Sequence, residues 1–392
     1  MIRICAGDPT DWLHRHRGKR PLFACILSFT ETGLIPDISA AGMTTQARQY
    51  TALADAELLA AKPDYYPFSQ GLTHQLTHRL PPLRAGVSPA IISRAILTQQ
   101  AIPFRLFSTG LPDRLKAEHT PLPDGTDNRL MHPVIAKAIH HKQAMSLAQV
   151  TALLESGLRW GHQLAMQCKS SYLIVGECVV GGTTTAQAVL TALGYDVAGR
   201  MSSSHQHSNH CQKQAIVRQG LRRWQQQDSH YRLSGKNEPL QVIAQLGDPM
   251  QIVAAGMTIA ASQQVGVLLA GGAQMLAVYK IAQALCTPPT TPAYADSKLT
   301  WNPEQVVVGT TRWVIEDATA DTSAIARDIG ATYIASEINF SQSRYFQLRA
   351  YERGFVKEGM GAGGCAIAAH LYKGWNGSQL RHAVESELKY AL

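Results

Sequence analysis

The spacing of apolar residues predicts an alternation of helices and strands from about residue 146 onward. Between Ser146 and Gln167, apolar residues recur every three or four positions, which predicts an amphipathic helix. The short apolar run 172–176 is typical of a buried strand instead. The same pattern continues with expected helices at 184–193, 212–227, 250–262 and 274–285, and with expected strands at 266–270, 306–309 and 332–335.

The first part of the chain has a less regular pattern. An apolar run at 23–29 predicts a buried strand, and a proline-rich section at 81–133 contains a short expected strand at 102–107. At the other end of the chain, residues 378–392 have an amphipathic helical pattern, with Ser378 as the expected N-cap.

This alternation predicts an α/β fold in which a doubly wound, mainly parallel sheet is flanked by helices. A parallel sheet is covered on both faces, so its strands are apolar along their whole length, as the expected strands are here. In such folds ligands bind at the carboxyl ends of the strands. The glycine-rich turns of this chain fall at those ends, and we therefore look for a site there.

Composition and charge narrow the class of protein. The 392 residues are 45% hydrophobic and 16% charged, which is typical of a folded chain with a large core. The net charge of +8 is not gathered into a stripe of Lys and Arg with aromatic residues between them, so we expect no nucleic-acid partner. A mild positive balance fits small anionic substrates such as nucleotides.

Cysteine usage and hydropathy predict a cytoplasmic protein that does not enter a membrane. The seven cysteines are scattered, odd in number and without a C-x-x-C pair, which indicates reduced thiols. Charged residues precede the first apolar run, unlike in a signal peptide. The most apolar stretch, 265–285, is interrupted by glycines and by Lys280, so it is not expected to span a membrane.

The first chemical motif is GECVVGGTTT at 176–185, between an expected strand and an expected helix. It is close to the phosphate loop G-x-x-x-x-G-K-[ST], but Gly182 occupies the lysine position. The backbone amides of Gly181, Gly182, Thr183 and Thr184 would still attract a phosphate at the helix N-terminus. A monophosphate site therefore fits better than an NTPase. The alternative is a plain strand-to-helix turn with a threonine cap.

A second motif, SSSHQHSNHCQK at 202–213, gathers three histidines and a cysteine. The spacing of His205, His207, His210 and Cys211 matches no standard zinc site, and a solvated loop explains it more simply, so we expect no metal. Lys213 lies just inside the following expected helix. It is a candidate for the positive charge that the glycine-rich loop lacks, or else a surface lysine.

Two further glycine-rich turns follow, LLAGGAQM at 268–275 and KEGMGAGG at 357–364. Gly271 and Gly272 would let a ligand approach the backbone. Glu358 precedes a glycine turn and an apolar helix, where a carboxylate with a raised pKa could act as a general base. The alternative is a glutamate that interacts with the helix dipole.

These segments in this order resemble the nicotinate-nucleotide:dimethylbenzimidazole phosphoribosyltransferase family. The resemblance extends to the N-terminal ETGLIPDISAAGMTTQARQYTALADAE, covers nearly the whole chain, and is closest to the archaeal and cyanobacterial branch. Classical bacterial members have G-I-G-N-T-T where this chain has VVGGTT, so Val179 and Gly182 depart from their pattern. They also have an Asp-Gly turn where this chain has Ala270 and Gly271.

The resemblance implies a small helical lobe from both chain ends and a homodimer. On this basis we expect an N-terminal region, 1–145, that contributes a strand and part of the lobe and of the acceptor-base pocket. A nucleotide-binding core would cover 146–372, and 373–392 would form the C-terminal helix of the lobe.

The resemblance also implies roles for individual residues. The general base would be Glu358, the second site glutamate Glu177, and the phosphate-binding lysine Lys213. The substrate-binding glycines and threonines would be Gly181, Gly182, Thr183, Thr184, Gly271, Gly272, Gly359 and Gly361. Neither a cofactor nor a metal is expected, because no pyrophosphate leaves in this reaction.

The implied reaction moves ribose 5-phosphate from nicotinate mononucleotide to a lower-ligand base such as dimethylbenzimidazole. Its products are nicotinate and an α-ribazole-type phosphate for the nucleotide loop of a cobamide. Three alternatives stay open: a relative that uses adenine or a phenol, a phosphatase-like activity, and a nucleotide-binding or regulatory protein without turnover.

Overall fold

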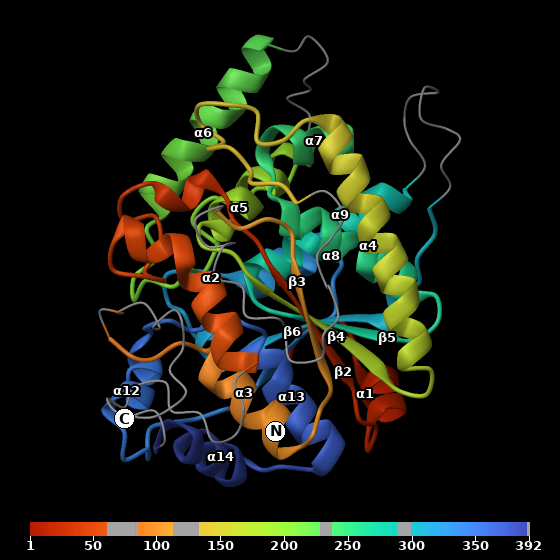
Figure 1. Ribbon diagram of the computed structural model, residues 1–392, viewed down its shortest axis with the longest axis vertical. Helices are drawn as coiled ribbons and strands as arrows, with labels where there is room; N and C mark the ends of the chain where they lie inside the picture. The colour runs from red at the N-terminus through yellow and green to blue at the C-terminus, as the bar shows by residue number, and fades with distance from the viewer. Residues whose placement is uncertain (61–82, 84, 113–132, 228–236, 288–298, 390–392) are drawn as a thin grey trace.

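The structure, a computed structural model, describes residues 1–60, 83, 85–112, 133–227, 237–287 and 299–389 (Figure 1). Its centre is a seven-stranded sheet with the order β1-β7-β6-β5-β4-β2-β3. All neighbouring strands run parallel except β1, which pairs antiparallel with β7. The strands are β1 (Ile2–Ala6), β2 (Leu22–Leu27), β3 (Phe104–Ser108), β4 (Tyr172–Cys178), β5 (Gly266–Ala270), β6 (Val306–Thr311) and β7 (Tyr333–Ser336).

Helices cover both faces of the sheet, which confirms the doubly wound α/β fold. One face carries α4 (Leu147–Gln167), α5 (Gly182–Ala192), α7 (Pro239–Leu246), α8 (Pro249–Ser262), α9 (Ala273–Cys286) and α11 (Thr322–Ile329). The other carries α1 (Thr10–His16), α2 (Thr45–Ala60), α3 (Ala90–Gln99), α13 (Ala362–Lys373) and α14 (Gly377–Lys389). The remaining helices are α6 (His210–Gln227), α10 (Arg312–Ile315) and α12 (Phe346–Arg349).

Alternation along the strands explains the two cores. In β4, Leu173 and Val175 point into the core under α4 and α8, whereas Tyr172 and Ile174 point into the core under α3 and α13. All seven residues of β4 are buried, as expected for a strand in the middle of a parallel sheet.

Helices α4 and α8 pack unusually closely against each other because of two glycines one turn apart on α4. A Cβ atom at Gly157 would lie 2.5 Å from the backbone oxygen of Val253. A Cβ atom at Gly161 would lie 2.4 Å from the backbone oxygen of Met257. The backbones of the two helices therefore touch where only hydrogen atoms fit between them.

Segments from both chain ends build the helical layer on the second face, and the expected small lobe stays a prediction. Helix α3 packs against α13 and α14, and Figure 1 shows these three helices side by side. The guanidinium of Arg94 on α3 donates to Glu387 on α14, and its Nη1 donates to the backbone oxygen of Leu58 on α2 at 2.7 Å. The N-terminal region also supplies three strands to the common sheet. The proposed division at residues 145 and 372 stays a prediction.

The expected helices and strands beyond residue 146 are confirmed within a few residues of their bounds. Two local details differ. The capping residue of α14 is Asn376, whose side chain accepts from the backbone of Gln379 at 2.9 Å, so the expected N-cap at Ser378 is wrong. Helix α5 begins with Gly181 as its N-cap, in the left-handed region at φ 87°, and has no threonine cap.

Several elements among the described residues of the first hundred were not expected, and three of them illustrate why. Strand β1 is short and lies at the edge of the sheet, where Arg3 and Glu337 form an ion pair at 2.5 Å. Helix α2 contains alanines on several sides, so no distinct apolar stripe marks it in the sequence. Helix α3 has ten residues, follows Pro89 and is buried along most of its length. It lies inside the proline-rich section, and the prolines around it hid its helical pattern in the sequence.

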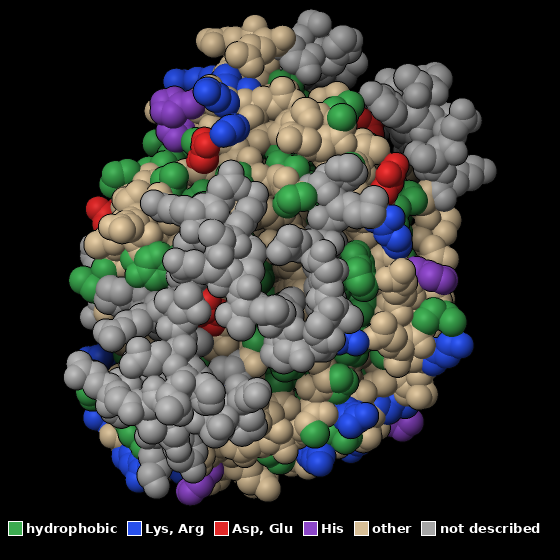
Figure 2. Space-filling view, viewed as in Figure 1, with side chains coloured by type: hydrophobic (Ala, Val, Ile, Leu, Met, Phe, Trp, Pro, Cys, Tyr) green, Lys and Arg blue, Asp and Glu red, His purple; other side chains and the backbone are tan. Residues whose placement is uncertain are grey.

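Lys and Arg side chains are spread in separate groups over the face shown in Figure 2. Within the described ranges, no helix is both long and apolar enough to cross a membrane. All seven cysteines lie in described residues, and none forms a disulfide.

Candidate active site

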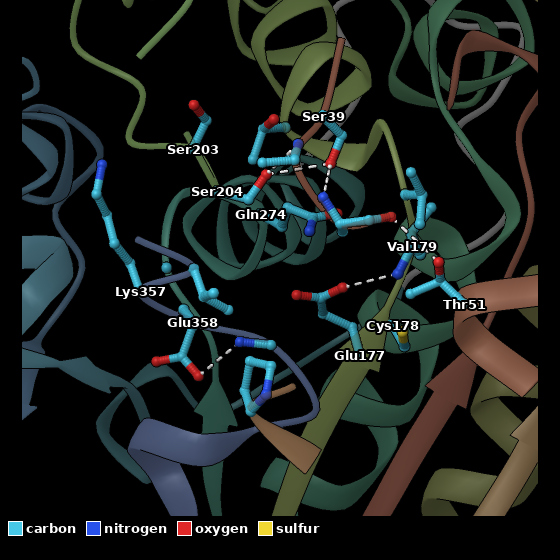
Figure 3. A pocket seen from close by; sticks show the side chains of 18 of the residues that line it. Ser39, Thr51, Glu177, Cys178, Val179, Ser203, Ser204, Gln274, Lys357 and Glu358 are labelled. Atoms are coloured by element: carbon cyan, nitrogen blue, oxygen red, sulfur yellow. Dashed lines mark hydrogen bonds between the residues drawn. The ribbon is translucent and has the colours of Figure 1, made fainter. Parts of the chain in front are cut away.

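A cavity of about 980 Å³, including its open mouth, lies at the carboxyl ends of the parallel strands. It is bounded by the end of β4 and the start of α5, the start of α9, and the turn 356–359. Residues 39–41 and 202–204 and parts of α2 and α3 complete the wall. The cavity therefore lies where ligands bind in doubly wound folds, as the sequence predicted. Figure 3 shows it from close by.

Glu358 is held in the cavity wall by four donors from the protein. Its Oε1 accepts from the backbone nitrogens of Gly359 and Gly363, each at 3.1 Å. Its Oε2 accepts from Thr311 N at 2.9 Å and from the hydroxyl of Thr310 at 3.1 Å. Burial raises the pKa of Glu358 to about 7, against these hydrogen bonds, which act to lower it. The carboxyl group therefore titrates near neutral pH.

The turn that carries Glu358 has a strained backbone. Val356, Lys357 and Met360 have φ of 70°, 65° and 51°, in the left-handed region that side chains with a Cβ rarely adopt. Gly363 is required beside them, because a Cβ there would lie 2.6 Å from Glu358 Oε2 and 2.4 Å from Thr311 N. Such strain is typical of sites where a side chain must be held in one position.

Glu177 projects from the end of β4 into the same cavity (Figure 3). Its Oε2 accepts from Val179 N at 3.1 Å, and its backbone oxygen accepts from Met360 N at 3.1 Å, which joins β4 to the turn of Glu358. Burial, together with the negative charges of Glu358 and Asp248, raises the pKa of Glu177 to about 8. The two glutamates therefore interact, and their protons belong to the pair.

Lys357 precedes Glu358 but points the opposite way (Figure 3). Its Nζ donates to Asp317 Oδ2 at 2.6 Å and to the backbone oxygen of His205 at 2.8 Å. Asp317 also accepts from the hydroxyl of Ser202 at 2.8 Å. Burial alone would raise the pKa of Asp317, but the hydrogen bonds from Lys357 and Thr319 bring that pKa below its ordinary value. This buried ion pair joins the turn to the segment 202–208.

Lys213 lies one turn into α6 and is fully buried, so the alternative of a surface lysine is wrong. It is not among the residues that line the cavity. Within the described residues, its Nζ has no hydrogen-bond partner. Burial, together with the nearby charge of Lys357, lowers the pKa of Lys213 to about 7. An unpartnered buried ammonium is costly, and an anionic ligand would compensate it.

The glycines and threonines expected at the site fall into two groups. Gly181, Thr183, Gly272 and Gly359 line the cavity. Behind this wall lie Gly182, Thr184, Gly271 and Gly361, which the cavity does not reach. A Cβ at Gly182 would lie 1.8 Å from the side-chain oxygen of Gln274, so this glycine gives room to a residue of the wall.

Several polar residues of the cavity were not anticipated from the sequence. Asp55 and Thr51 come from α2, and Ser88 lies two residues before the start of α3. The other unanticipated residues of the cavity wall are Ser39, Cys178, Ser202, Ser203, Ser204, Gln274 and Lys357. The only signal for Asp55 was an acidic residue within an apolar, alanine-rich helix, ALADAELLA.

Two of the three histidines in the 202–213 segment contact backbone oxygens. His205 Nε2 lies 3.0 Å from the backbone oxygen of Asp37, and His210 Nε2 contacts the backbone oxygen of Thr319. Among the described residues, no group of three or more His, Cys, Asp or Glu side chains is arranged to hold a metal ion.

The fold and the cavity define an α/β protein with a small-molecule site that contains two interacting glutamates. A family model described as phosphoribosyltransferase, DBI_PRT, matches residues 114–295. The UPF0284 protein of Trichodesmium erythraeum (strain IMS101) is 50% identical over 388 residues, covering 98% of this chain and 97% of that relative. The UPF0284 protein of Cyanothece sp. (strain PCC 7425 / ATCC 29141) is 50% identical over 376 residues, covering 96% and 93%.

Among solved structures, a nicotinate-nucleotide-dimethylbenzimidazole phosphoribosyltransferase from Thermus thermophilus has a similar fold. The TM-score is 0.55 at 13% identity, over 95% of this chain and 84% of that one. The chain thus belongs to the UPF0284 family, and the match of residues 114–295 to the phosphoribosyltransferase model confirms the resemblance to the nicotinate-nucleotide:dimethylbenzimidazole phosphoribosyltransferase family.

Proposed function

We propose that this protein transfers ribose 5-phosphate from nicotinate mononucleotide to a lower-ligand heterocycle such as dimethylbenzimidazole. The products are nicotinate and an α-ribazole-type phosphate for the nucleotide loop of a cobamide. The observation that carries the proposal is the buried carboxyl group of Glu358, held at the cavity with a pKa of about 7, where a general base at neutral pH needs it.

In this reaction the bond between C1′ and the nicotinate nitrogen breaks, and a bond from C1′ to a ring nitrogen of the acceptor forms. The leaving group is a cationic pyridinium before departure, so it leaves without protonation. The acceptor loses its N–H proton to Glu358 as its other nitrogen attacks, with inversion at C1′.

Thr310 is the donor that can yield to the incoming proton. Three of the four donors to Glu358 are backbone N–H groups, which are fixed, whereas the Thr310 hydroxyl can rotate. We therefore assign Thr310 the role of releasing one acceptor position on Oε2 when the substrate approaches.

Glu177 would stabilise the positive charge of the donor. A cationic pyridinium, and then a sugar with oxocarbenium character, would lower the pKa of the neighbouring carboxyl group and favour its ionised form. The resulting carboxylate would interact most strongly with the transition state, in which the sugar carries the developing positive charge.

The phosphate of the donor would bind between Lys213 and the N-terminus of α5. The support is the unpartnered, fully buried Nζ of Lys213 and the backbone of 181–184 at the start of the helix. The turns at 271–272 and 359–361 would let the nucleotide lie close to the backbone. Binding the phosphate far from C1′ would convert binding energy into alignment of the reacting atoms.

The first experiment incubates the purified protein with nicotinate mononucleotide and a panel of dimethylbenzimidazole, benzimidazole, adenine and p-cresol. Chromatography follows nicotinate release and α-nucleotide formation. We expect nicotinate release that depends on the added base. If folded protein released no nicotinate with any base of the panel, the proposed reaction would be refuted. A rise in melting temperature with nicotinate mononucleotide but without turnover would favour a binding protein. The homodimer stays a prediction, checked by sedimentation.

A further inference from the structure

We propose that the acceptor is a heterocycle with an exocyclic amino group, and that Asp55 binds the N–H of that group. This inference rests on the proposed function and narrows its acceptor to one chemical class. It assigns a specificity role to a residue of α2 that no sequence motif marks.

Asp55 is a buried carboxyl group that lines the cavity with few protein partners. It is 4% exposed, and its Oδ1 accepts from the hydroxyl of Ser88 at 2.6 Å. Its Oδ2 is 3.7 Å from the thiol of Cys178, which is a weak donor. In the parts of the chain that the structure describes, no Lys, Arg or His forms an ion pair with Asp55. Of about four acceptor positions on a carboxylate, two therefore lack a donor.

Glu358, in the same cavity, differs from Asp55 in the number of donors that its carboxyl group receives from the protein. All four of its acceptor positions are taken by donors of the protein, so it needs no ligand to be satisfied. Asp55 is less exposed than Glu358 but is only half satisfied. A buried polar group without its hydrogen bonds is costly, and at a cavity wall the missing donors are those of a ligand.

The position of Asp55 matches the acceptor rather than the donor phosphate. It contacts Cys178, and Figure 3 shows Cys178 and Thr51 on one side of the cavity and Lys357 and Ser203 on the other. Glu177 lies between the two sides. The phosphate, a dianion, is repelled by a carboxylate and attracted toward the lysines. The end of the cavity at Asp55 is thus left for the base.

The chemistry of the acceptor follows from this pairing. Both ring nitrogens of a benzimidazole are used in the reaction, one for attack and one for proton loss. Dimethylbenzimidazole has only C–H groups elsewhere and would leave Asp55 unsatisfied. An amino group on the ring donates a charge-assisted hydrogen bond to the carboxylate. Burial raises the pKa of Asp55 to about 6, so the group is mainly ionised at neutral pH.

The test compares benzimidazole with 4-aminobenzimidazole, which differ only in the amino group, with nicotinate mononucleotide as donor. Nicotinate release gives kcat/KM for each base. We expect the wild type to prefer 4-aminobenzimidazole by about 10- to 100-fold, the discrimination typical of one hydrogen bond to a buried charged group. In Asp55→Asn this preference falls to near one. The matched control, Asp328→Asn at a half-exposed surface aspartate, keeps the full preference.

The outcomes separate this inference from the proposed function. Equal rates for the two bases in the wild type, or an equal loss for both in Asp55→Asn, would overturn the role of Asp55 but leave the transfer reaction standing. Absence of nicotinate release with every base would refute the proposed function. In that event, the relative affinities of the two bases for wild type and Asp55→Asn, measured by calorimetry, decide the role of Asp55. If Asp55→Asn does not fold, Ser88→Ala, which removes the strong donor to Asp55, is expected to reduce the same preference.

Discussion

Replacing Glu358 with glutamine keeps the shape of the side chain and removes its ability to take a proton. The structure also predicts how the amide would orient. An NH2 group in place of Oε1 would face two backbone N–H groups, those of Gly359 and Gly363. In place of Oε2 it would face one, that of Thr311, and the hydroxyl of Thr310, which can rotate to accept. The second orientation is therefore expected.

The magnitudes follow from that geometry. One backbone N–H without a partner costs about 1–3 kcal/mol of folding free energy, and removal of a buried ionisable group offsets part of that cost. The variant should therefore fold. Loss of a general base lowers the rate by about 10²- to 10⁴-fold, or about 2.7–5.5 kcal/mol in the activation barrier.

The assay is nicotinate release from nicotinate mononucleotide across the pH range around neutrality. Because Glu358 must be ionised to accept a proton, kcat/KM of the wild type should rise with pH through about 7, the pKa of this group. Glu358→Gln should lack that rise. Thr310→Ser, which keeps the rotating hydroxyl, serves as the control and should retain both the rate and the rise.

The result that would refute this reasoning is a Glu358→Gln variant with the wild-type kcat and pH profile. A variant with reduced kcat but an unchanged rise through pH 7 would assign the titration to another group. The roles of the two glutamates would then be exchanged, with Glu177 as the general base, since Glu177 is the other glutamate of the cavity with a raised pKa.

Three further predictions follow from buried groups and close contacts. The pKa of Lys213 is about 7 in the folded state, against an ordinary value of 10.5. Between these two values the unfolded state binds more protons than the folded state. The wild type therefore loses stability as the pH falls through that range. Lys213→Met should therefore be more stable in urea at pH 7 and gain less in melting temperature from nicotinate mononucleotide; an equal gain would exclude Lys213 as a phosphate ligand. Glu177 has a folded-state pKa of about 8 against 4.5, so the folded state binds more protons in that window and Glu177→Gln should gain stability relative to wild type as pH rises from 4.5 to 8. A difference in unfolding free energy that is constant with pH would contradict the pKa of Glu177. Gly161→Ala should cost about 1–3 kcal/mol in chemical denaturation, because its Cβ meets the Met257 backbone oxygen at 2.4 Å, whereas Gly377→Ala, in open space, should be neutral.

The sequence predicts the core of the fold well because the determinants are local. Each strand from β4 onward begins with a short apolar run, and glycine-rich turns follow β4 and β5. Glu177 lies at the end of β4 and Glu358 lies in a further glycine-rich turn, and both line the same cavity. The chemistry of the pair was therefore accessible before the structure.

The acceptor side of the cavity was not accessible in the same way. Helix α2 has buried alanines at 52, 54 and 56, so its pattern lacks the contrast that marks an amphipathic helix. Ser202 and Ser203 belong to a polar run that suggests solvent, yet both are buried, and the hydroxyl of Ser202 binds Asp317. Such residues are polar because of partners distant in sequence, which a local pattern does not reveal.

The layer shared by the two chain ends has a consequence for synthesis. All seven strands of the described sheet precede residue 337, whereas Glu358, α13 and α14 follow them along the chain. A nascent chain that ends before them would hold the sheet with the apolar faces of α3, β4 and β5 uncovered. The proposed general base and the cover of the second core lie in the same segment after the sheet, so a chain that lacks this segment would lose both.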